Sequence, residues 1–430
     1  MSTDNKKSRC SRISGFYNMP LEERLKIVKE WAQLSDDEIA MLSNFGNLDR
    51  KIAETMIENV VGAMSYPFAV AVNFKINGKD YLIPMVLEEP SVVAAASNAA
   101  RMLREGEGIS AEASGQLMLG QVYMMKVPSP YYASMEILKH KNELLDIANS
   151  TNRTLLKVGG GAKDIEVKVI ETRRGMAIVI NLIVDVVDAM GANTVNTMAE
   201  AIAPYLERLV GGEARLRIVS NYAIYRLVRA WVRVAPENIG GREIAEKIVD
   251  ASAIAEADPF RAVTHNKGIL NGIIAVALAT AQDHRAIEAG AHAYAARSGI
   301  YKPLSRWDLD SNGYLVGFME IPLQVGIVGG AVKTHPIAQI ALKIMGIKTA
   351  KELAEIMAAV GLAQNFAALR ALVTTGIQSG HMKLHAKNLA ILAGAKGELI
   401  EIIANQMIKD GKISFDYAKQ LLEKYEKSLN

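Results

Sequence analysis

The chain has 430 residues, and its 49 Lys and Arg residues against 46 Asp and Glu residues give a formal net charge of +3 at pH 7. This near balance disfavours a role on nucleic acid or at a membrane surface, where a strong basic excess is expected. Half of the residues are apolar and 6% are aromatic, so we expect a globular protein of two or three domains packed mainly through aliphatic side chains.

The N-terminal residues MSTDNKKSRCSR are followed by no apolar segment, so we expect no secretory signal. The longest apolar runs, such as MAIVINLIV, are about half of the ~20 residues that span a bilayer. Cys10 is the one cysteine, which excludes an internal disulfide framework and is typical of a reducing compartment. The sequence therefore predicts a soluble, cytoplasmic protein with no membrane partner and no nucleic-acid partner.

The first part of the chain predicts a helix, a hairpin and a second helix. Residues 19–34 repeat apolar residues at steps of three and four behind a proline, which indicates an amphipathic helix. Residues 68–86 indicate two strands joined at Asn77-Gly78, a strong hairpin signal. Ser91 then stands at the expected N-cap of an alanine-rich helix.

Between about residues 116 and 221 the pattern becomes that of a compact α+β unit inserted into a larger helical domain. IEVKVIETRRGMAIVINLIVDVV predicts two strands around an RRG turn, NTMAEAIAPYLERLV predicts a helix, and ARLRIVSN predicts another strand. After residue 221 we expect a mainly helical chain with Gly-rich breaks, which ends in a capped helix within ISFDYAKQLLEKYEKSLN.

Three standard motifs are incomplete. VGGGAKD (158–164) lacks the Ser or Thr and the spacing of a phosphate loop, so it favours a strand or turn. No G-x-G-x-x-G follows a strand, which disfavours a standard dinucleotide fold. HMKLH (381–385) places two histidines one helical turn apart, but it lacks the glutamate of H-E-x-x-H and any Cys/His cluster. We expect no metal site.

The polar residues around Lys267, in THNKG, allow two interpretations. A buried lysine is costly unless it is paired, so Lys267 and Asp283 could form a structural salt bridge. Alternatively, a carboxylate holds the lysine charged while it faces a carbonyl oxygen that becomes an oxyanion. Similarly, Glu89 is either a charge near a helix start or a proton donor, and His381 taken alone indicates an exposed residue. The pattern itself does not separate these alternatives.

Five segments, in order along residues 15 to 425, resemble one enzyme family. This is the soluble, class II type of 3-hydroxy-3-methylglutaryl-coenzyme A (HMG-CoA) reductase, found in bacteria and some archaea. The segments are ENVVG (58–62), LEEPSVVAAAS (87–97), DAMGANTVNTMAEA (188–201), DPFRAVTHNKGILNG (258–272) and TTGIQSGHMKLHA (374–386).

The resemblance implies an NAD(P)H-dependent oxidoreductase that reduces a thioester in two hydride steps to mevalonate and releases coenzyme A. Lys267 would stabilise the first oxyanion, and His381 would protonate the departing thiolate. Glu89 would protonate the aldehyde oxygen, for which we expect a buried carboxyl group with a raised pKa. Asp283 would hydrogen-bond to Lys267 and couple it to Glu89.

The resemblance also implies two sets of binding residues. The substrate's terminal carboxylate would be held by Arg261. The expected neighbours of the substrate are Ser91, Thr264, Asn271 and Gln364. The expected neighbours of the nicotinamide cofactor are Asp188, Met190, Gly191 and Asn193, with Asn221 nearby.

The domain organisation that the resemblance implies has three parts. A large, mainly helical substrate and dimerisation domain comprises residues 1–115 and 222–375, and a small non-Rossmann α+β cofactor domain comprises residues 116–221. A C-terminal helical flap, 376–430, carries His381. The expected assembly is a homodimer with active sites shared between subunits, alone or within a larger assembly of dimers.

The chain departs from the family pattern at three positions. Tyr17 replaces an arginine that some relatives use toward coenzyme A, and Val332 replaces the threonine that usually ends the glycine-rich signature. Asn152 stands where relatives that prefer NADH carry an aspartate. Without that charge, and with Arg153 beside it, the sequence predicts a preference for NADPH or the use of both cofactors.

Two other functions remain compatible with these residues. A Lys, Asp and Glu set can polarise any thioester, so a non-redox thioesterase or acyl-CoA lyase is one alternative. An inactive acyl-CoA-binding protein is the other, although it would be free to lose any of the four residues Glu89, Lys267, Asp283 and His381.

Overall fold

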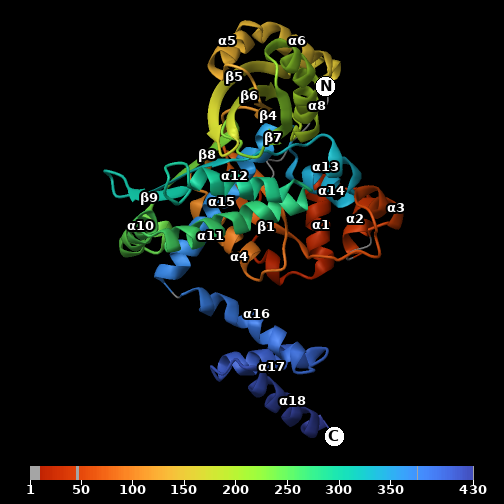
Figure 1. Ribbon diagram of the computed structural model, residues 1–430. Coiled ribbons are helices and arrows are strands. Elements are labelled where there is room, and N and C mark those ends of the chain that lie inside the picture. Colours follow the sequence, from red (N-terminus) through yellow and green to blue (C-terminus); the bar gives the residue numbers. More distant parts are fainter. Residues whose placement is uncertain (1–9, 45–47, 375, 430) are drawn as a thin grey trace, which may run out of the picture.

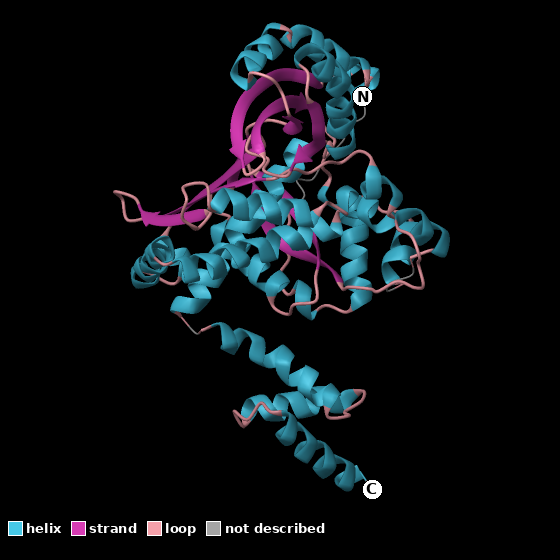
Figure 2. Cartoon of the chain, in the orientation of Figure 1, coloured by secondary structure: helices cyan, strands magenta, loops and turns pink. Residues whose placement is uncertain are grey.

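Helices and antiparallel sheets are mixed along the chain (Figure 2). The computed structural model describes residues 10–44, 48–374 and 376–429, without the side chains of residues 17, 377–384 and 426–429. In these residues the strands form one two-stranded and two four-stranded sheets. The four-stranded sheet within residues 117–220, called the small sheet below, lies with its helices at one end of a helix-rich body. The last helices extend from the other end (Figure 1). The expected mixture of helix and sheet is confirmed.

The predicted N-terminal helix is present as α1 (Leu21–Ala32), with Pro20 as its N-cap. It packs against α14 (Pro336–Met345), where Trp31 Nε1 donates to the carbonyl of Ile344 at 3.1 Å. The other elements of this region are η1 (Phe16–Asn18), α2 (Asp36–Ser43) and α3 (Arg50–Met56).

The predicted hairpin is confirmed as β1 (Phe68–Ile76) and β2 (Lys79–Val86). The turn residues Asn77 and Gly78 have φ angles of 49° and 76°, which is the backbone that a tight type I′ turn requires. Glu89 lies in the short segment that follows β2, so the hairpin fixes the position of this carboxylate.

The expected cap at Ser91 is wrong in its chemistry. Ser91 does precede α4 (Val92–Leu103), but its φ is 71° and its side chain makes no capping hydrogen bond. A capping serine has an extended backbone that turns its oxygen toward the first helical amides, and the left-handed backbone of Ser91 does not. A non-glycine residue costs of order 1 kcal/mol in this conformation, so the turn beside Glu89 is strained.

The small sheet has the strand order β5-β6-β4-β7, with all neighbours antiparallel. Its predicted hairpin and third strand are confirmed, and Gly161 begins β5, in agreement with a strand or turn role for the glycine run. The central strand β4, LMLGQVYMM, was missed because Met and Gly give it a weak strand pattern. The strands are β4 (Leu117–Met125), β5 (Gly161–Thr172), β6 (Gly175–Asp185) and β7 (Glu213–Ser220).

The predicted helix of this unit is confirmed as α8 (Ala192–Val210), which lies against β4 and β7. The other helices here are α5 (Pro130–Lys139), α6 (Lys141–Ser150) and α7 (Arg153–Lys157). Sheet and helices enclose a hydrophobic core of their own, which runs from Met118 to Ala223 and includes Ile180 and Leu206. An antiparallel sheet of this order differs from the parallel sheet of a Rossmann fold.

The body contains a second four-stranded sheet, so the expectation of a mainly helical chain after residue 221 is incomplete. Its strands, in the order β3-β8-β10-β9, are β3 (Ser110–Ala113), β8 (Leu227–Val234), β10 (Leu315–Pro322) and β9 (Ser305–Leu309). β8 alternates buried and exposed residues, a strand signal present in LVRAWVRV that the sequence analysis did not use.

Two long helices, α11 (Pro259–Ala279) and α15 (Ala350–Val373), cross the middle of the body. α15 is long and apolar enough to cross a membrane, but 67% of its apolar window is buried inside the body, as in the core helix of a globular protein. The remaining helices of the body are α9 (Pro236–Ile239), α10 (Arg242–Ala257), α12 (His284–Ala295) and α13 (Gly330–Thr334).

The last three helices are α16 (Ile377–Leu392), α17 (Glu398–Lys409) and α18 (Phe415–Leu429). They pack on one another around a separate small core that includes Ala390, Ile403 and Leu421. The predicted capped C-terminal helix is confirmed as α18, with Ser414 Oγ accepting from the backbone N–H of Tyr417 at 3.2 Å.

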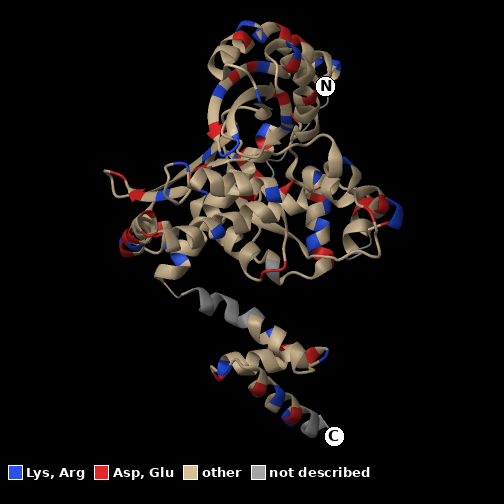
Figure 3. Cartoon of the chain, viewed as in Figure 1, with Lys and Arg blue, Asp and Glu red and all other residues tan. Residues whose placement is uncertain are grey.

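Acidic and basic residues are intermixed along the chain in the body and the small sheet (Figure 3). Arg229 on β8 pairs with Glu320 on the neighbouring strand β10, and Arg233 pairs with Asp310, which directly follows β9, each at 2.7 Å. Because both arginines are exposed, water screens these pairs and they contribute little to stability.

A buried polar cluster holds α11 against α15 and β9. Trp307 Nε1 donates to Asn365 Oδ1 at 2.7 Å, which orients the amide so that Asn365 Nδ2 faces His265 Nε2 at 3.0 Å. Ser305 Oγ lies 2.6 Å from the same ring nitrogen. Because Nε2 faces an N–H donor, the ring stays neutral, and burial together with the charge of Arg261 lowers the pKa of His265 to about 3.

We predict that this histidine makes the unfolding free energy fall in acid. The unfolded chain takes up a proton near the usual pKa of 6.5, whereas the folded chain does not until about pH 3, so stability is full above pH 6.5 and is lost progressively below it. The loss is at most about 1.4 kcal/mol per pH unit. In urea titrations from pH 7 to 4.5, the stability advantage of wild type over His265→Gln should therefore shrink. The exposed-site variant His385→Gln should track wild type, and a constant advantage over His265→Gln would contradict the assignment.

Candidate active site

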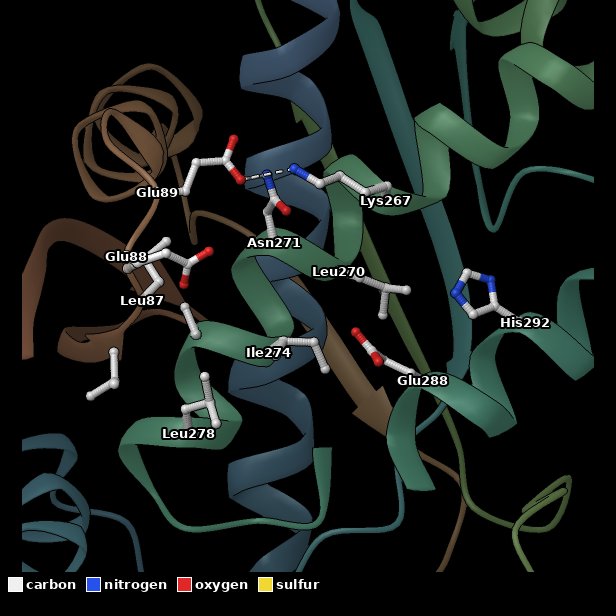
Figure 4. Close-up of a pocket in the computed structure, with 12 residues that line it drawn as sticks. Leu87, Glu88, Glu89, Lys267, Leu270, Asn271, Ile274, Leu278, Glu288 and His292 are labelled. Carbon is white, nitrogen blue, oxygen red and sulfur yellow. Dashed lines mark hydrogen bonds and ion pairs between the residues drawn. The ribbon is translucent and has the colours of Figure 1, made fainter. Parts of the chain in front are cut away.

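A cavity of about 190 Å³ opens between the end of the β1–β2 hairpin, α11 and α12 (Figure 4). Glu89, Lys267 and Asn271 lie at one end, aliphatic residues such as Ile274 and Leu278 lie at the other, and Glu288 and His292 line the cavity from α12. The lining residues are Val86, Leu87, Glu88, Glu89, Lys267, Leu270, Asn271, Ile274, Ala275, Leu278, Glu288 and His292.

Glu89, Lys267 and Asn271 meet at the mouth of this cavity (Figure 4). Lys267 Nζ donates to Glu89 Oε2 at 2.8 Å, and Asn271 Nδ2 approaches the same oxygen at 3.5 Å. Lys267 and Asn271 lie one turn apart on α11, so their side chains share a face of the helix. The hairpin brings Glu89 to that face from nearly 180 residues away in the sequence.

The expected burial of these two charges is wrong for this chain by itself. The Lys267 side chain is 59% exposed and that of Glu89 is 37% exposed. The lysine is therefore not a structural cation in the core, because water reaches both groups. An incoming ligand can reach them in the same way.

The expected contact between Lys267 and Asp283 is absent from the part of the chain that the structure describes. Asp283 is the N-cap of α12, where Oδ1 accepts from the N–H of Ala286 at 3.1 Å, and Arg285 lies 3.4 Å away. Capping directs the carboxylate along α12, whereas Lys267 pairs with Glu89. The structural salt bridge that the sequence allowed is therefore wrong within one chain.

Arg261 and Thr264 lie on α11 before Lys267. Over the ten residues from Arg261 to Asn271 the helix rises about 15 Å, so these polar groups form an elongated strip. The guanidinium of Arg261 is half-buried, and in the described chain no hydrogen bond or ion pair engages it. Burial lowers the pKa of Arg261, because the guanidinium is not fully hydrated. An incoming carboxylate would therefore pair with a partly desolvated cation. Thr264 is exposed, with Oγ1 3.4 Å from the carbonyl of Phe260.

Ser91 and Gln364 approach this region from other elements. Ser91 follows Glu89 by two residues at the start of α4. Gln364 lies on α15, is 5% exposed, and its Oε1 has no hydrogen-bond partner within the described residues. A buried amide oxygen without a partner is costly, so Gln364 is a place where a ligand donor would be favoured.

Four of the expected cofactor residues lie in the loop before α8 and in its first turn. Gly191 is the N-cap, with φ of 100°, and a Cβ there would lie 2.5 Å from Val186 Cγ1, so only glycine fits. Asp188 Oδ1 accepts from the N–H of Ala350 at 2.7 Å, at the start of α15. The other two, Met190 and Asn193, flank the helix start, where free N–H groups favour an anion.

The remaining expected cofactor residues lie in separate places. Asn221 follows β7, and its carbonyl accepts from Gln324 Nε2 at 3.2 Å. Asn152 is the N-cap of α7, where Oδ1 accepts from the N–H of Leu155 at 3.0 Å. Arg153 is the exposed residue beside it.

Some residues lie beyond these expectations. The side chains of His381 and Tyr17 lie outside the described residues. Among the side chains that are described, no group of three His, Cys, Asp or Glu could hold a metal ion.

Three residues were not predicted from the sequence. They are Glu288 and His292, on the far side of the cavity, and the buried Arg226. Of these three, only Glu288 and His292 carry a sequence signal, which is their helical spacing, and surface helices share that spacing.

Comparison with known proteins identifies a family. Residues 20–386 match the family model described as hydroxymethylglutaryl-coenzyme A reductase. The chain is 55% identical over 420 residues to 3-hydroxy-3-methylglutaryl-coenzyme A reductase of Archaeoglobus fulgidus, which covers 97% of this chain and 96% of that protein. It is 34% identical over 435 residues to a probable enzyme of the same name from Borreliella burgdorferi, covering 99% and 98% of the two chains.

Solved structures give the same result. A 3-hydroxy-3-methylglutaryl-coenzyme A reductase structure from Streptococcus pneumoniae superposes with a TM-score of 0.82 at 43% identity, over 96% of this chain and 99% of that one. A class II structure from the same organism, bound to NADPH in open conformations, has a TM-score of 0.80 at 44% identity, over 95% and 100%. Sequence and fold thus agree over nearly the whole length, and the chain belongs to the 3-hydroxy-3-methylglutaryl-coenzyme A reductases, within class II.

Proposed function

We propose that the cavity between β2, α11 and α12 is where this enzyme, a nicotinamide-dependent HMG-CoA reductase, acts on its substrate. The reaction is the two-step, four-electron reduction of the HMG-CoA thioester to mevalonate with release of coenzyme A, or its reverse. The observation that carries the proposal is the contact of 2.8 Å between Lys267 and Glu89 at an accessible cavity mouth. This contact joins the amino group and the carboxyl group that the proposed chemistry would use.

Lys267 is proposed as the group that stabilises negative charge on the substrate's thioester oxygen. The ammonium group is held by Glu89 and lies on a helix that is buried along its opposite side, so its position is set before the substrate arrives. A fixed charge where an oxyanion develops is among the largest catalytic contributions.

Proton transfers are proposed for two other residues. Glu89 would protonate the aldehyde oxygen in the second reduction, and closure of the site around the substrate would supply the burial that raises a carboxyl pKa. His381, on the C-terminal helices, would protonate the coenzyme A thiolate after the hemithioacetal collapses. The helices 376–430 would act as a flap that brings this histidine to the cavity and excludes water.

Substrate binding is proposed along the polar strip of α11. The half-buried guanidinium of Arg261 suits the terminal carboxylate of HMG-CoA, since no other group in the described chain neutralises it. The neighbouring hydrogen-bonding groups would be Ser91, Thr264, Asn271 and Gln364, the last through its unpartnered oxygen.

The residues before α8 fit a nicotinamide dinucleotide. Gly191, which packs directly against Val186, is the N-cap of a 19-residue helix, and at this helix start Asp188, Met190 and Asn193 would hold the cofactor together with Asn221. A related structure from Streptococcus pneumoniae binds NADPH. The reduced nicotinamide, when bound, supplies the hydrides. Residues 116–221 are accordingly proposed as the cofactor domain and residues 1–115 with 222–375 as the substrate and dimerisation domain.

A cytoplasmic homodimer is proposed as the working form. The segment 57–64, which contains ENVVG, has apolar side chains that one chain leaves exposed: Ile57 is 65% exposed, Met64 82% and Val61 fully. A self-complementary contact across a two-fold axis would bury them. In such a dimer Asp283 would act on Lys267 of the partner subunit, because it does not reach Lys267 within its own chain.

The overall reaction can be tested by its stoichiometry and by Lys267→Ala. Wild type should consume two reduced nicotinamides per coenzyme A released, as followed by nicotinamide absorbance and thiol titration. Lys267→Ala should lower kcat by about 10²–10³-fold with little change in thermal stability, because the pair is exposed. Lys247→Ala, which removes another exposed ion-paired lysine from α10, is the matched control. Release of coenzyme A without nicotinamide use would indicate a thioesterase, and binding without turnover would indicate a sensor.

Mixed dimers test the shared site. Lys267→Ala and Asp283→Ala chains with different affinity tags are co-expressed, and the doubly tagged dimer is purified. If Lys267 and Asp283 act from different subunits, each mixed dimer keeps one complete site and about half of the wild-type activity. If they act within one chain, every site lacks one residue and the mixed dimer is as inactive as the two parents.

Cofactor preference is proposed to depend on residue 152. We expect wild type to use NADPH at least as well as NADH, and Asn152→Asp to lower the ratio of kcat/KM for NADPH to that for NADH by about 10-fold or more. Aspartate also caps helices, so α7 should be retained. Ser150→Asp, which adds the same charge at an exposed neighbouring position, is the control. A wild-type preference for NADH of about 100-fold, or 2.7 kcal/mol, would refute the proposal.

A further inference from the structure

Arg226 is a buried cation at the junction between the small sheet and the body. Arg226 is the residue immediately before β8, and it is 1% exposed. Burial lowers its pKa to about 10, so the guanidinium remains protonated at neutral pH. Because a buried charge is costly unless its N–H groups are bonded, the partners of Arg226 indicate its role.

Those partners come from three separate chain segments. Nη2 donates to the carbonyl of Val325 at 2.6 Å, in the body segment after β10, and to the side chain of Gln116, just before β4. Nη1 donates to the carbonyls of Met190 at 3.0 Å and Ala189 at 3.3 Å, in the loop before α8. A planar guanidinium can bind on both sides at once, which the single ammonium of a lysine cannot do.

The loop that Arg226 holds is strained and tightly fitted. Val187 has φ of 51°, a conformation that is unfavourable for a β-branched residue and persists only when its surroundings enforce it. The N–H of Ile327 donates to the carbonyl of Asp188 at 2.8 Å. A Cβ at Gly326 would lie 2.3 Å from the backbone nitrogen of Met190, so loop and body segment touch backbone to backbone.

The same body segment also holds the residue before Asp283. Gln282 is buried, its Nε2 donates to the carbonyl of Gly326, and its Oε1 accepts from the N–H of Gly326, both at 2.9 Å. Ala281, with φ of 52°, makes the turn that brings Gln282 to this position. The segment around Gly326 thus lies between the loop 188–191 and the start of α12.

We propose that Arg226 is a positioning residue for the nicotinamide cofactor, which locks the loop 188–191 onto the body segment 325–328 and so sets the cofactor loop relative to α11 and α12. This inference rests on the proposed function, since it takes the loop 188–191 as the cofactor site. It assigns no contact between Arg226 and either substrate. Its effect should therefore fall on the cofactor rather than on the acyl-CoA.

The full-length enzyme is compared with Arg226→Lys and Arg226→Met. Both variants should raise the KM for NADPH about 10-fold or more while the KM for HMG-CoA stays within about 2-fold. Calorimetric titration with NADPH alone should show a matching rise in Kd. Amide hydrogen exchange at residues 187–191 should become faster. Arg229→Met, which removes an exposed arginine from the adjacent strand β8, should change none of these quantities.

An unchanged NADPH affinity in Arg226→Met, or an equal rise in both KM values, would overturn the proposal. If Arg226→Met does not fold, Gln116→Leu removes one partner of the guanidinium and should give the same split between the two KM values, at about 3-fold. Failure of the proposed function gives a different result, because wild type would then oxidise no NADPH in the presence of HMG-CoA. The direct NADPH titration would still decide whether Arg226 positions the loop.

Discussion

The close approach of α11 and α15 is the constraint on which the rest of the structure depends. A Cβ at Gly272 would lie 3.0 Å from Gln364 Cβ, and a Cβ at Gly361 would lie 2.8 Å from Ile273 Cδ1. Each helix therefore has a glycine where the other presses against it. Residues such as Ile269, Ile273 and Val276 are consequently fully buried between the helices, and their packing contributes stability roughly in proportion to the apolar area removed from water. One side of α11 is fixed in this way, and the other side is free to carry Arg261, Lys267 and Asn271.

The buried polar cluster adds direction to that packing. His265 Nε2, Ser305 Oγ and Asn365 contact one another in one arrangement of α11, α15 and β9, whereas aliphatic contacts alone tolerate rotation of a helix about its axis. A rotation by one residue, about 100°, would turn Lys267 away from Glu89. The neutral histidine in the core and the charged lysine at the surface are thus two parts of one arrangement, although they differ by only two positions in the sequence.

The site of a single chain is open, and this agrees with chemistry that needs parts to come together. Lys267 and Glu89 are exposed to water, Asp283 lies away from them, and the C-terminal helices extend from the body. Water weakens the electrostatic stabilisation that an oxyanion requires, so catalysis needs closure. The junction at Arg226 has the opposite character, because Nη1 and Nη2 of the buried guanidinium are already bonded to backbone carbonyls. With the cofactor and acyl-CoA sites proposed above, a rigid cofactor junction beside an open cavity would allow one substrate to be placed before the site closes over the other.

The sequence by itself determined the local structure of this protein and the identity of its chemistry. The Asn77-Gly78 turn, the RRG hairpin and the helix α8 that follows this hairpin result from backbone preferences and short-range periodicity, which act within a few residues. The family resemblance singled out Glu89 and Lys267 as expected catalytic residues, and the two are in contact at 2.8 Å. The sequence did not reveal the body sheet, in which β3 is separated from β8 by the whole small sheet and its helices, and β8 is separated from the β9–β10 hairpin by α9 to α12. Only the tertiary structure decided that Lys267 pairs with Glu89 rather than Asp283, that both charges are exposed, and that Arg226 is buried. Burial and pairing depend on which distant segments pack together, and no pattern within one segment contains that information.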